Sequence, residues 1–219
     1  MFLNLQILRS LSKYITPKKE NRVALTGVLV EINQDKVFYV ATDGHKLAAF
    51  QSERFKGDEL VEGKYIIPKS VIDSFKNKTM LDAGFTYNPE LNGSYTLSDT
   101  VNSVTFNLVD SDFPDWRSIL KRLEITDEKD KAADIDPAYL QAIQECYLSY
   151  AKAAKPNRAY RHVVKLFQNG KSPSYMVAEG DSSFIGVVMP YRAPENAEKS
   201  FILDNWMKRD NQAPVLKAA

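Results

Sequence analysis

The sequence contains few of the residues from which catalytic and metal centres are built. Its 219 residues include one cysteine, Cys146, and two histidines. A single cysteine excludes an internal disulfide and fits a reducing compartment, and so sparse a ligand set disfavours a zinc site. The Gly-rich phosphate and dinucleotide loops and the Gly-x-Ser-x-Gly turn of hydrolases are absent. We therefore expect no catalytic residue, no metal and no cofactor.

Charge and hydropathy exclude further classes of protein. The formal net charge is +1, whereas a protein that grips DNA through many phosphates carries a larger basic excess. No run of about 18 apolar residues could cross a membrane, and the N-terminus lacks the features of a signal peptide. An apolar content of 44% is enough for a packed core. We expect a cytoplasmic protein of one large or two small domains.

Hydrophobic periodicity predicts groups of helices and strands. Helices are expected at residues 4–16, from Pro68 onward and from Asp136-Pro137 onward, and Cys146 falls on the apolar face of the last. Strands are expected at residues 23–31, 36–42, 65–67, 84–87, 94–98, 103–109, 163–167, 175–178 and 184–189. A charged connector at 121–135 suggests units at 1–122 and 123–193 and a tail at 194–219. This order of elements is typical of an α+β fold.

The stretch at residues 39–50 has the features of a site. A β-branched and aromatic strand runs into Asp43-Gly44, a strong turn signal, because glycine tolerates positive φ and aspartate can hydrogen-bond its own backbone. After His45 and Lys46 the sequence becomes apolar again. A polar turn held between two apolar strands can line a pocket, and an ordinary hairpin has the same pattern.

Other segments accompany this turn in a specific order. They are Leu25–Glu31, Tyr65-Ile66-Ile67-Pro68-Lys69, Phe113-Pro114-Asp115-Trp116-Arg117 and Val187-Val188-Met189-Pro190-Tyr191-Arg192. Together with the turn they resemble the bacterial DNA polymerase III β subunit, the sliding clamp. The resemblance covers the middle domain of that family over residues 1 to 122 and the end of its last domain near 163–192. It implies a DNA-clamp-like fold of antiparallel sheets with helices on one face.

The resemblance also implies a pocket for short linear motifs of polymerases and other clamp partners. In clamps the turn, the Phe-Pro-Asp-Tyr loop and the Val-Val-Met-Pro segment converge on that pocket. The matching positions are Thr42, Gly44, His45, Lys46, Leu47, Pro114, Ile119, Val187, Met189, Pro190 and Arg192. Lys46 and Ser118 stand where the family often has arginine. Because lysine lacks the planar fork of arginine, we expect an altered motif preference.

A clamp also contacts double-stranded DNA loosely and without sequence preference, through helices that line its central hole. The candidate contacts here are Arg9, Lys13, Lys69, Lys76, Lys152 and Lys155. A ring of six similar units would require a homotrimer of a two-unit chain, joined through unpaired sheet edges. We expect such edges at residues 94–109 and 184–189.

Two alternatives stay open. A clamp-like decoy or modulator would bind the partners of clamps without encircling DNA. A metal-dependent hydrolase or nuclease would instead use the carboxylates of Asp110, Asp112 and Asp115, together with His45.

Overall fold

The computed structural model describes residues 1–17, 21–54, 62–77, 79–124, 131–154 and 163–191. The predicted tail therefore lies outside the described residues. The helices are α1 (Leu5–Tyr14), the 3-10 helix η1 (Val23–Thr26), α2 (Lys69–Ser74), α3 (Trp116–Glu124) and α4 (Pro137–Ala154). The strands are β1 (Phe2–Asn4), β2 (Gly27–Ile32), β3 (Lys36–Thr42), β4 (Lys46–Glu53), β5 (Gly63–Pro68), β6 (Asp82–Asn88), β7 (Ser94–Ser98), β8 (Ser103–Phe106), β9 (Val164–Phe167), β10 (Ser174–Ala178) and β11 (Asp181–Val188).

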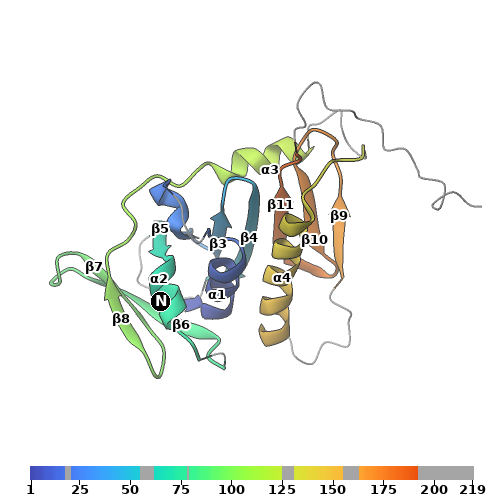
Figure 1. The fold of residues 1–219 in the computed structure, drawn as a ribbon. Coiled ribbons are helices and arrows are strands. Elements are labelled where there is room, and N and C mark those ends of the chain that lie inside the picture. The colour runs from blue at the N-terminus through green and yellow to red at the C-terminus, as the bar shows by residue number, and fades with distance from the viewer. Residues whose placement is uncertain (18–20, 55–61, 78, 125–130, 155–162, 192–219) are drawn as a thin grey trace, which may run out of the picture.

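The strands form two sheets, and every pair of neighbouring strands is antiparallel. One sheet has the order β1-β6-β7-β8 and the other the order β5-β2-β3-β4-β11-β10-β9 (Figure 1). The predicted α+β class is confirmed. In the seven-stranded sheet β4 pairs with β11, with Leu47 opposite Val187, so strands from both predicted units share one sheet. The division into two domains stays a prediction.

Helices α1, α2 and α4 cover one face of the seven-stranded sheet, which we call the inner face. Helix α1 begins as predicted at Asn4, whose side-chain oxygen accepts a hydrogen bond from the Ile7 N–H at 3.0 Å. Helix α4 packs against α1 and begins after Asp136, whose carboxylate accepts from the Ala138 N–H at 2.8 Å. The Cys146 thiol is fully buried, and burial raises its pKa, so its predicted role in core packing is confirmed.

Helix α3 was not predicted. We expected a loop and then a charged connector, but residues 116–124 form a helix across the other face of the sheet, which we call the outer face (Figure 1). Its apolar residues Trp116, Ile119, Leu120 and Leu123 pack on that face and recur at helical spacing. The helix begins where Asp115 accepts a hydrogen bond from the Ser118 N–H at 3.2 Å.

Two other predictions were wrong. Residues 23–26 are a 3-10 helix rather than the start of a strand, and the Thr26 hydroxyl donates to the Val23 carbonyl at 2.7 Å. Strand β11, expected at a sheet edge, is internal because β4 and β10 pair on its two sides. Within the described residues, the edges of the seven-stranded sheet are β5 and β9. Of the strands at residues 94–109, β8 is an edge of the smaller sheet as expected, whereas β7 is internal because β6 and β8 pair on its two sides.

Candidate functional site

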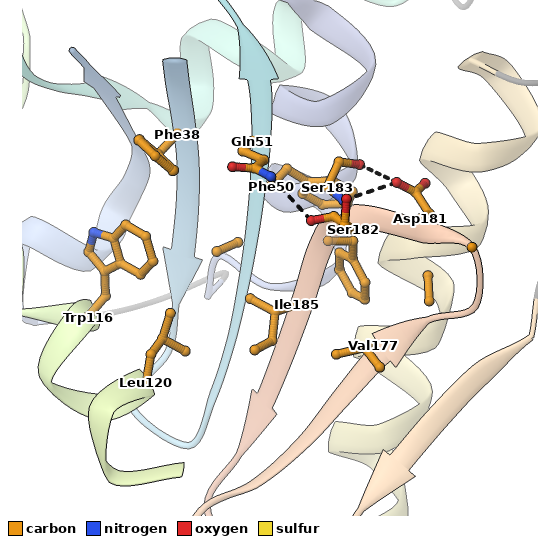
Figure 2. Close-up of a pocket in the computed structure, with 14 residues that line it drawn as sticks. Phe38, Phe50, Gln51, Trp116, Leu120, Val177, Asp181, Ser182, Ser183 and Ile185 are labelled. Atoms are coloured by element: carbon orange, nitrogen blue, oxygen red, sulfur yellow. Dashed lines mark hydrogen bonds between the residues drawn. The ribbon is translucent and has the colours of Figure 1, made fainter. Parts of the chain in front are cut away.

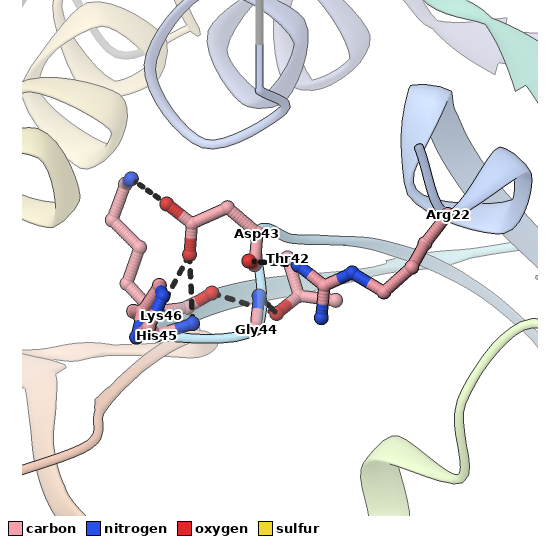
Figure 3. A network of polar contacts seen from close by, with 6 residues as sticks. All are labelled: Arg22, Thr42, Asp43, Gly44, His45 and Lys46. Carbon is pink, nitrogen blue, oxygen red and sulfur yellow. Dashed lines mark hydrogen bonds and ion pairs between the residues drawn. The ribbon is translucent and has the colours of Figure 1, made fainter. Parts of the chain in front are cut away.

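The turn between β3 and β4 is held by its own side chains (Figure 3). The Asp43 carboxylate accepts from the backbone N–H groups of His45 and Lys46, both at 2.9 Å, and forms an ion pair with the Lys46 ammonium. The Thr42 hydroxyl accepts from the Gly44 N–H at 3.0 Å and donates to the Lys46 carbonyl at 2.7 Å. Gly44 has φ +89°, and a Cβ there would lie 2.6 Å from the Arg22 guanidinium. The turn geometry therefore depends on both Asp43 and Gly44.

Opposing effects act on the Asp43 carboxyl. Burial raises its pKa, but the hydrogen bonds from the Lys46 side chain and from the backbone of Lys46 and His45 outweigh burial, and the pKa is lowered overall. The carboxylate is thus the form that the folded turn prefers, and it neutralises the neighbouring Lys46 ammonium.

Contacts tie the turn to the second predicted unit. The His45 ring stacks on Tyr139 of α4 with centroids 5.7 Å apart, and the Lys46 ammonium lies 5.3 Å from the centroid of the same ring. The His45 carbonyl accepts from the Met189 N–H at 2.8 Å, directly after β11. These contacts bring the segment at 187–190 beside residues 42–47.

A cavity of about 280 Å³ lies next to this turn, and we call it the turn cavity. Nine of the eleven predicted pocket residues line it: Thr42, Gly44, His45, Lys46, Leu47, Pro114, Ile119, Val187 and Met189. Pro190 follows Met189 but does not line the cavity, and Arg192 lies outside the described residues. Five further residues line the cavity and were not predicted from the sequence: Arg22, Leu25, Phe113, Trp116 and Arg122. Three of these residues, Leu25, Phe113 and Trp116, lie in the segments on which the resemblance to clamps rests. Their place in those segments could have identified them as pocket residues.

The turn cavity has an apolar floor and a partly basic rim. Leu47 and Val187, opposite each other on β4 and β11, are each 2% exposed. Arg22 and Arg122 are basic lining residues, and Arg22 donates to the Asp43 carbonyl at 2.7 Å. The Lys46 ammonium is instead paired with Asp43 beside Tyr139 of α4. Such a site suits an apolar anchor flanked by acceptors or carboxylates.

A second, larger cavity of about 680 Å³ is lined in part from the outer face, and we call it the sheet cavity (Figure 2). This cavity was not predicted from the sequence. Figure 2 shows Trp116 and Leu120 of α3 on one side, Val177 of β10 on the other and Ile185 between them. Among its lining residues in the described part of the chain, Asp181 alone is charged. Its carboxylate accepts from the hydroxyl of Ser183 at 2.6 Å and from that of Tyr147 at 3.3 Å.

The six predicted DNA-contact residues differ in how they are placed. The Arg9 guanidinium donates to the carbonyls of Phe75 and Met80 at 2.8 and 3.0 Å. The Lys69 ammonium donates to the Ser12 carbonyl and lies 3.3 Å from the Asp73 carboxylate. These two cations therefore tie α1 to the region of α2. The side chains of Lys13, Lys76 and Lys152 are exposed, and Lys155 lies outside the described residues.

Two features of the described residues bear on other functions. No group of three or more His, Cys, Asp or Glu side chains there is arranged to hold a metal ion, which includes Asp110, Asp112 and Asp115. Among the helices described, none is both long and apolar enough to span a membrane.

Comparison with known proteins agrees with this geometry. Residues 13–115 match the family described as DNA polymerase III beta subunit, central domain. The resemblance to the sliding-clamp family is confirmed. No curated protein matches the sequence. Solved clamps share the fold at low identity: that of Thermotoga maritima has a TM-score of 0.59 at 15% identity, and that of Pseudomonas aeruginosa 0.61 at 17%.

The sliding clamp of Bartonella birtlesii, solved bound to griselimycin, has a TM-score of 0.60 at 15% identity. These three matches cover 88% or 89% of this chain, but the chain spans only 65% or 66% of the length of those clamps. The match thus extends beyond the central domain into the segment that contains α4 and β9–β11. At these identities it shows the DNA-clamp fold, as expected from the sequence.

Proposed function

We propose that this chain is a sliding-clamp-like accessory protein of DNA replication or repair, which receives short linear motifs of a polymerase or other partners in the turn cavity. One observation carries the proposal. Residues from three segments far apart in the sequence, chosen for their resemblance to the clamp motif pocket, line one cavity. The apolar floor of Leu47 and Val187 fits a leucine or phenylalanine anchor of the motif.

The rim favours a motif that differs from those of other clamps. Lys46 stands where clamps often have arginine, and its ammonium is paired with Asp43. A lysine so engaged offers a partner carbonyl or carboxylate a weaker, non-bidentate contact. We expect the partner motif to depend more on its apolar anchor than on a polar residue at this position.

The pocket is tested with wild-type protein and the double variant Met189→Glu, Pro190→Ala. The wild type should retain a polymerase or a labelled motif peptide in a pull-down, and the double variant should lose it, because a carboxylate then enters an apolar cavity. Leu91→Glu is the matched control, since Leu91 is an exposed leucine in the turn between β6 and β7. Equal retention by the wild type and the double variant would contradict the proposal.

We further propose weak, salt-sensitive contact with DNA and assembly into a ring that acts as a processivity factor. A head-to-tail ring of three chains would supply six units, and β8 and β9 are edge strands within the described residues through which neighbouring chains could pair. Light scattering at several concentrations should give the mass of three chains, and the protein should stay on nicked circular DNA and leave it after linearisation. A concentration-independent monomer would exclude the ring and favour a modulator that binds clamp partners without encircling DNA.

A further inference from the structure

Three lysine or arginine residues line the turn cavity, and the charged groups of two of them are engaged by the turn itself. The Lys46 ammonium is paired with the Asp43 carboxylate and lies beside the Tyr139 ring. The Arg22 guanidinium donates to the Asp43 carbonyl at 2.7 Å and lies close to Gly44. A partner that recruited either cation would have to compete with a hydrogen bond that the folded turn already makes.

Arg122 is the third of these residues, and its guanidinium is not engaged in this way. Its side chain is exposed and, within the described part of the chain, makes no hydrogen bond, ion pair or ring contact. Arg117 on the same helix instead donates to both carboxylate oxygens of Glu31 at 2.7 Å. The two arginines of α3 therefore differ in role: Arg117 ties the helix to the sheet, and Arg122 is left to meet another molecule.

Helical spacing places Arg122 beside the apolar wall of the turn cavity. Trp116, Ile119 and Arg122 follow one another every three residues on α3, and all three line the cavity. Residues three apart share a face of a helix and are separated by about 4.5 Å along its axis. Because an extended chain advances about 3.4 Å per residue, an anchor that packs on Ile119 brings its own chain neighbours close to the Arg122 guanidinium.

The charges along α3 add a direction to this arrangement. At the start of the helix, the exposed Asp112 and Asp115 flank the lining residues Phe113 and Pro114. Asp115 precedes Arg122 by a stretch of helix that is about 10 Å long. A carboxylate of a bound segment is repelled at the acidic start of α3 and attracted at Arg122. The cavity therefore favours an acidic residue on the side of the anchor that faces the end of α3.

We propose that Arg122 is a specificity-determining residue of the turn cavity and pairs with an aspartate or glutamate of the bound segment. This inference rests on the proposed motif-binding function and adds the polar feature that the motif should carry. The planar guanidinium can donate two parallel hydrogen bonds to one carboxylate, a contact that the engaged Lys46 ammonium cannot supply. The preferred partner is thus a peptide with an acidic residue roughly one to three positions from its apolar anchor.

The test measures the binding of synthetic fluorescent peptides to the full chain. Every peptide carries a Leu-Phe anchor, and aspartate, alanine or lysine stands at one test position, roughly one to three residues before or after the anchor. At the position that reaches Arg122, the wild type should bind the aspartate peptide about fivefold more tightly than the alanine peptide, as is typical of an exposed ion pair. Added salt should reduce this preference.

Two variants change the proposed contact itself. Arg122→Glu should reverse the preference, so that the lysine peptide binds more tightly than the aspartate peptide. Arg122→Lys should retain a weaker preference for aspartate, because lysine keeps the charge but lacks the planar fork. A merely structural role of Arg122 would change stability in thermal unfolding without reversing the choice between peptides.

Lys121→Glu is the matched control. Lys121 is also exposed and lies beside Arg122 in the last turn of α3, but it does not line the turn cavity. The substitution changes the net charge and the charge at the helix end by the same amount as Arg122→Glu, and it should leave the preference for aspartate unchanged.

Each contrary outcome has its own meaning. Equal binding of the aspartate and alanine peptides by the wild type at every test position would overturn this inference alone. An equal loss of preference in Lys121→Glu and Arg122→Glu would also overturn it, because net charge rather than the Arg122 contact would then determine the choice. Absence of binding by every peptide would overturn the proposed function as well.

Discussion

The two faces of the seven-stranded sheet are built from the same strands and are covered differently. On β3, Tyr39 and Ala41 point to the inner face, and Phe38 and Val40 to the outer face. Three helices close the inner face, whereas α3 lies across the outer face (Figure 1), with Ala24 of η1 packed in the same outer cluster. The turn cavity lies on the outer face. The sheet cavity is lined from that face by Phe38, Ala49 and Ile185, and also by Phe50, Ala178 and Phe184 of the inner cluster.

This difference shows how one sheet can serve stability on one side and recognition on the other. Because both faces of the sheet carry apolar side chains, the sequences of its strands are nearly continuous apolar runs. The inner apolar residues meet partners within the chain, so their burial contributes to folding. The outer ones are only partly covered by α3, and the uncovered part is available to another molecule.

The largest expected effect compares two phenylalanines on opposite faces. Phe50 is 1% exposed on the inner face, with its ring centroid 5.0 Å from that of Tyr150 and 4.8 Å from that of Phe184. We expect Phe50→Ala to lower the free energy of unfolding by about 4 kcal/mol. Phe38 is only partly buried on the outer face, so Phe38→Ala should cost about 1–2 kcal/mol.

Urea unfolding of both variants at one temperature measures this difference directly. Equal losses of stability would mean that the outer face supports folding as strongly as the inner face, which would break the comparison.

A glycine on β11 gives the second prediction. A Cβ at Gly186 would lie 2.2 Å from Cγ2 of Ile143 on α4, a β-branched side chain that is fully buried. Gly186→Ala should therefore force α4 away from the inner face and cost about 2 kcal/mol. Gly63→Ala is the control, because a Cβ there meets only ordinary contacts with Tyr65. Thermal unfolding that gave the same small shift for both variants would contradict the close approach of α4 and β11.

Much of the inner face could be predicted from the sequence because its signals are local. The Asn4 cap and the Asp136-Pro137 start each lie beside the helix that they begin, and the apolar spacing of α4 identified its buried side. The turn residues of the candidate site were found because their resemblance to clamps is carried by short segments. Their convergence on one cavity came from the resemblance, since spacing alone does not place β11 beside β4.

The outer face was less predictable for a physical reason. Trp116, Ile119, Leu120 and Leu123 have helical spacing, but the charged residues of α3 run directly into the connector and hid the pattern. The sheet cavity is lined by β3, β4, α3, β10 and β11, so no single segment carries its signature. The internal position of β11 likewise depends on long-range pairing with β4.

The third prediction concerns the effect of pH on the turn between β3 and β4. Since the pKa of Asp43 is lowered in the folded protein, the unfolded chain binds the proton more readily. The carboxylate therefore contributes stability at neutral pH, and this contribution is lost as the pH falls below about 4. Asp43→Asn should cost about 1 kcal/mol at pH 7, and its difference from the wild type should shrink in acid. Urea unfolding from pH 7 to pH 3 measures this, and a difference that grows in acid would contradict the assigned hydrogen bonds.

The smallest expected effect concerns the helices that cover the inner face. Lys13, Lys76 and Lys152 lie on or just after these helices and are exposed, so replacing all three with glutamine should leave stability unchanged. If this side meets DNA, the triple variant should bind linear duplex more weakly, and the slope of log affinity against log salt should fall by up to about 3.

The control replaces the exposed Lys64, Lys121 and Lys171 with glutamine, which makes the same change of charge elsewhere on the molecule. An equal loss of DNA affinity in both triple variants would mean that net charge alone determines DNA binding. Binding of the motif peptide should be the same in the Lys13, Lys76, Lys152 variant as in the wild type, because none of these lysines lines the turn cavity. DNA contact and partner recognition would then belong to opposite faces of one sheet.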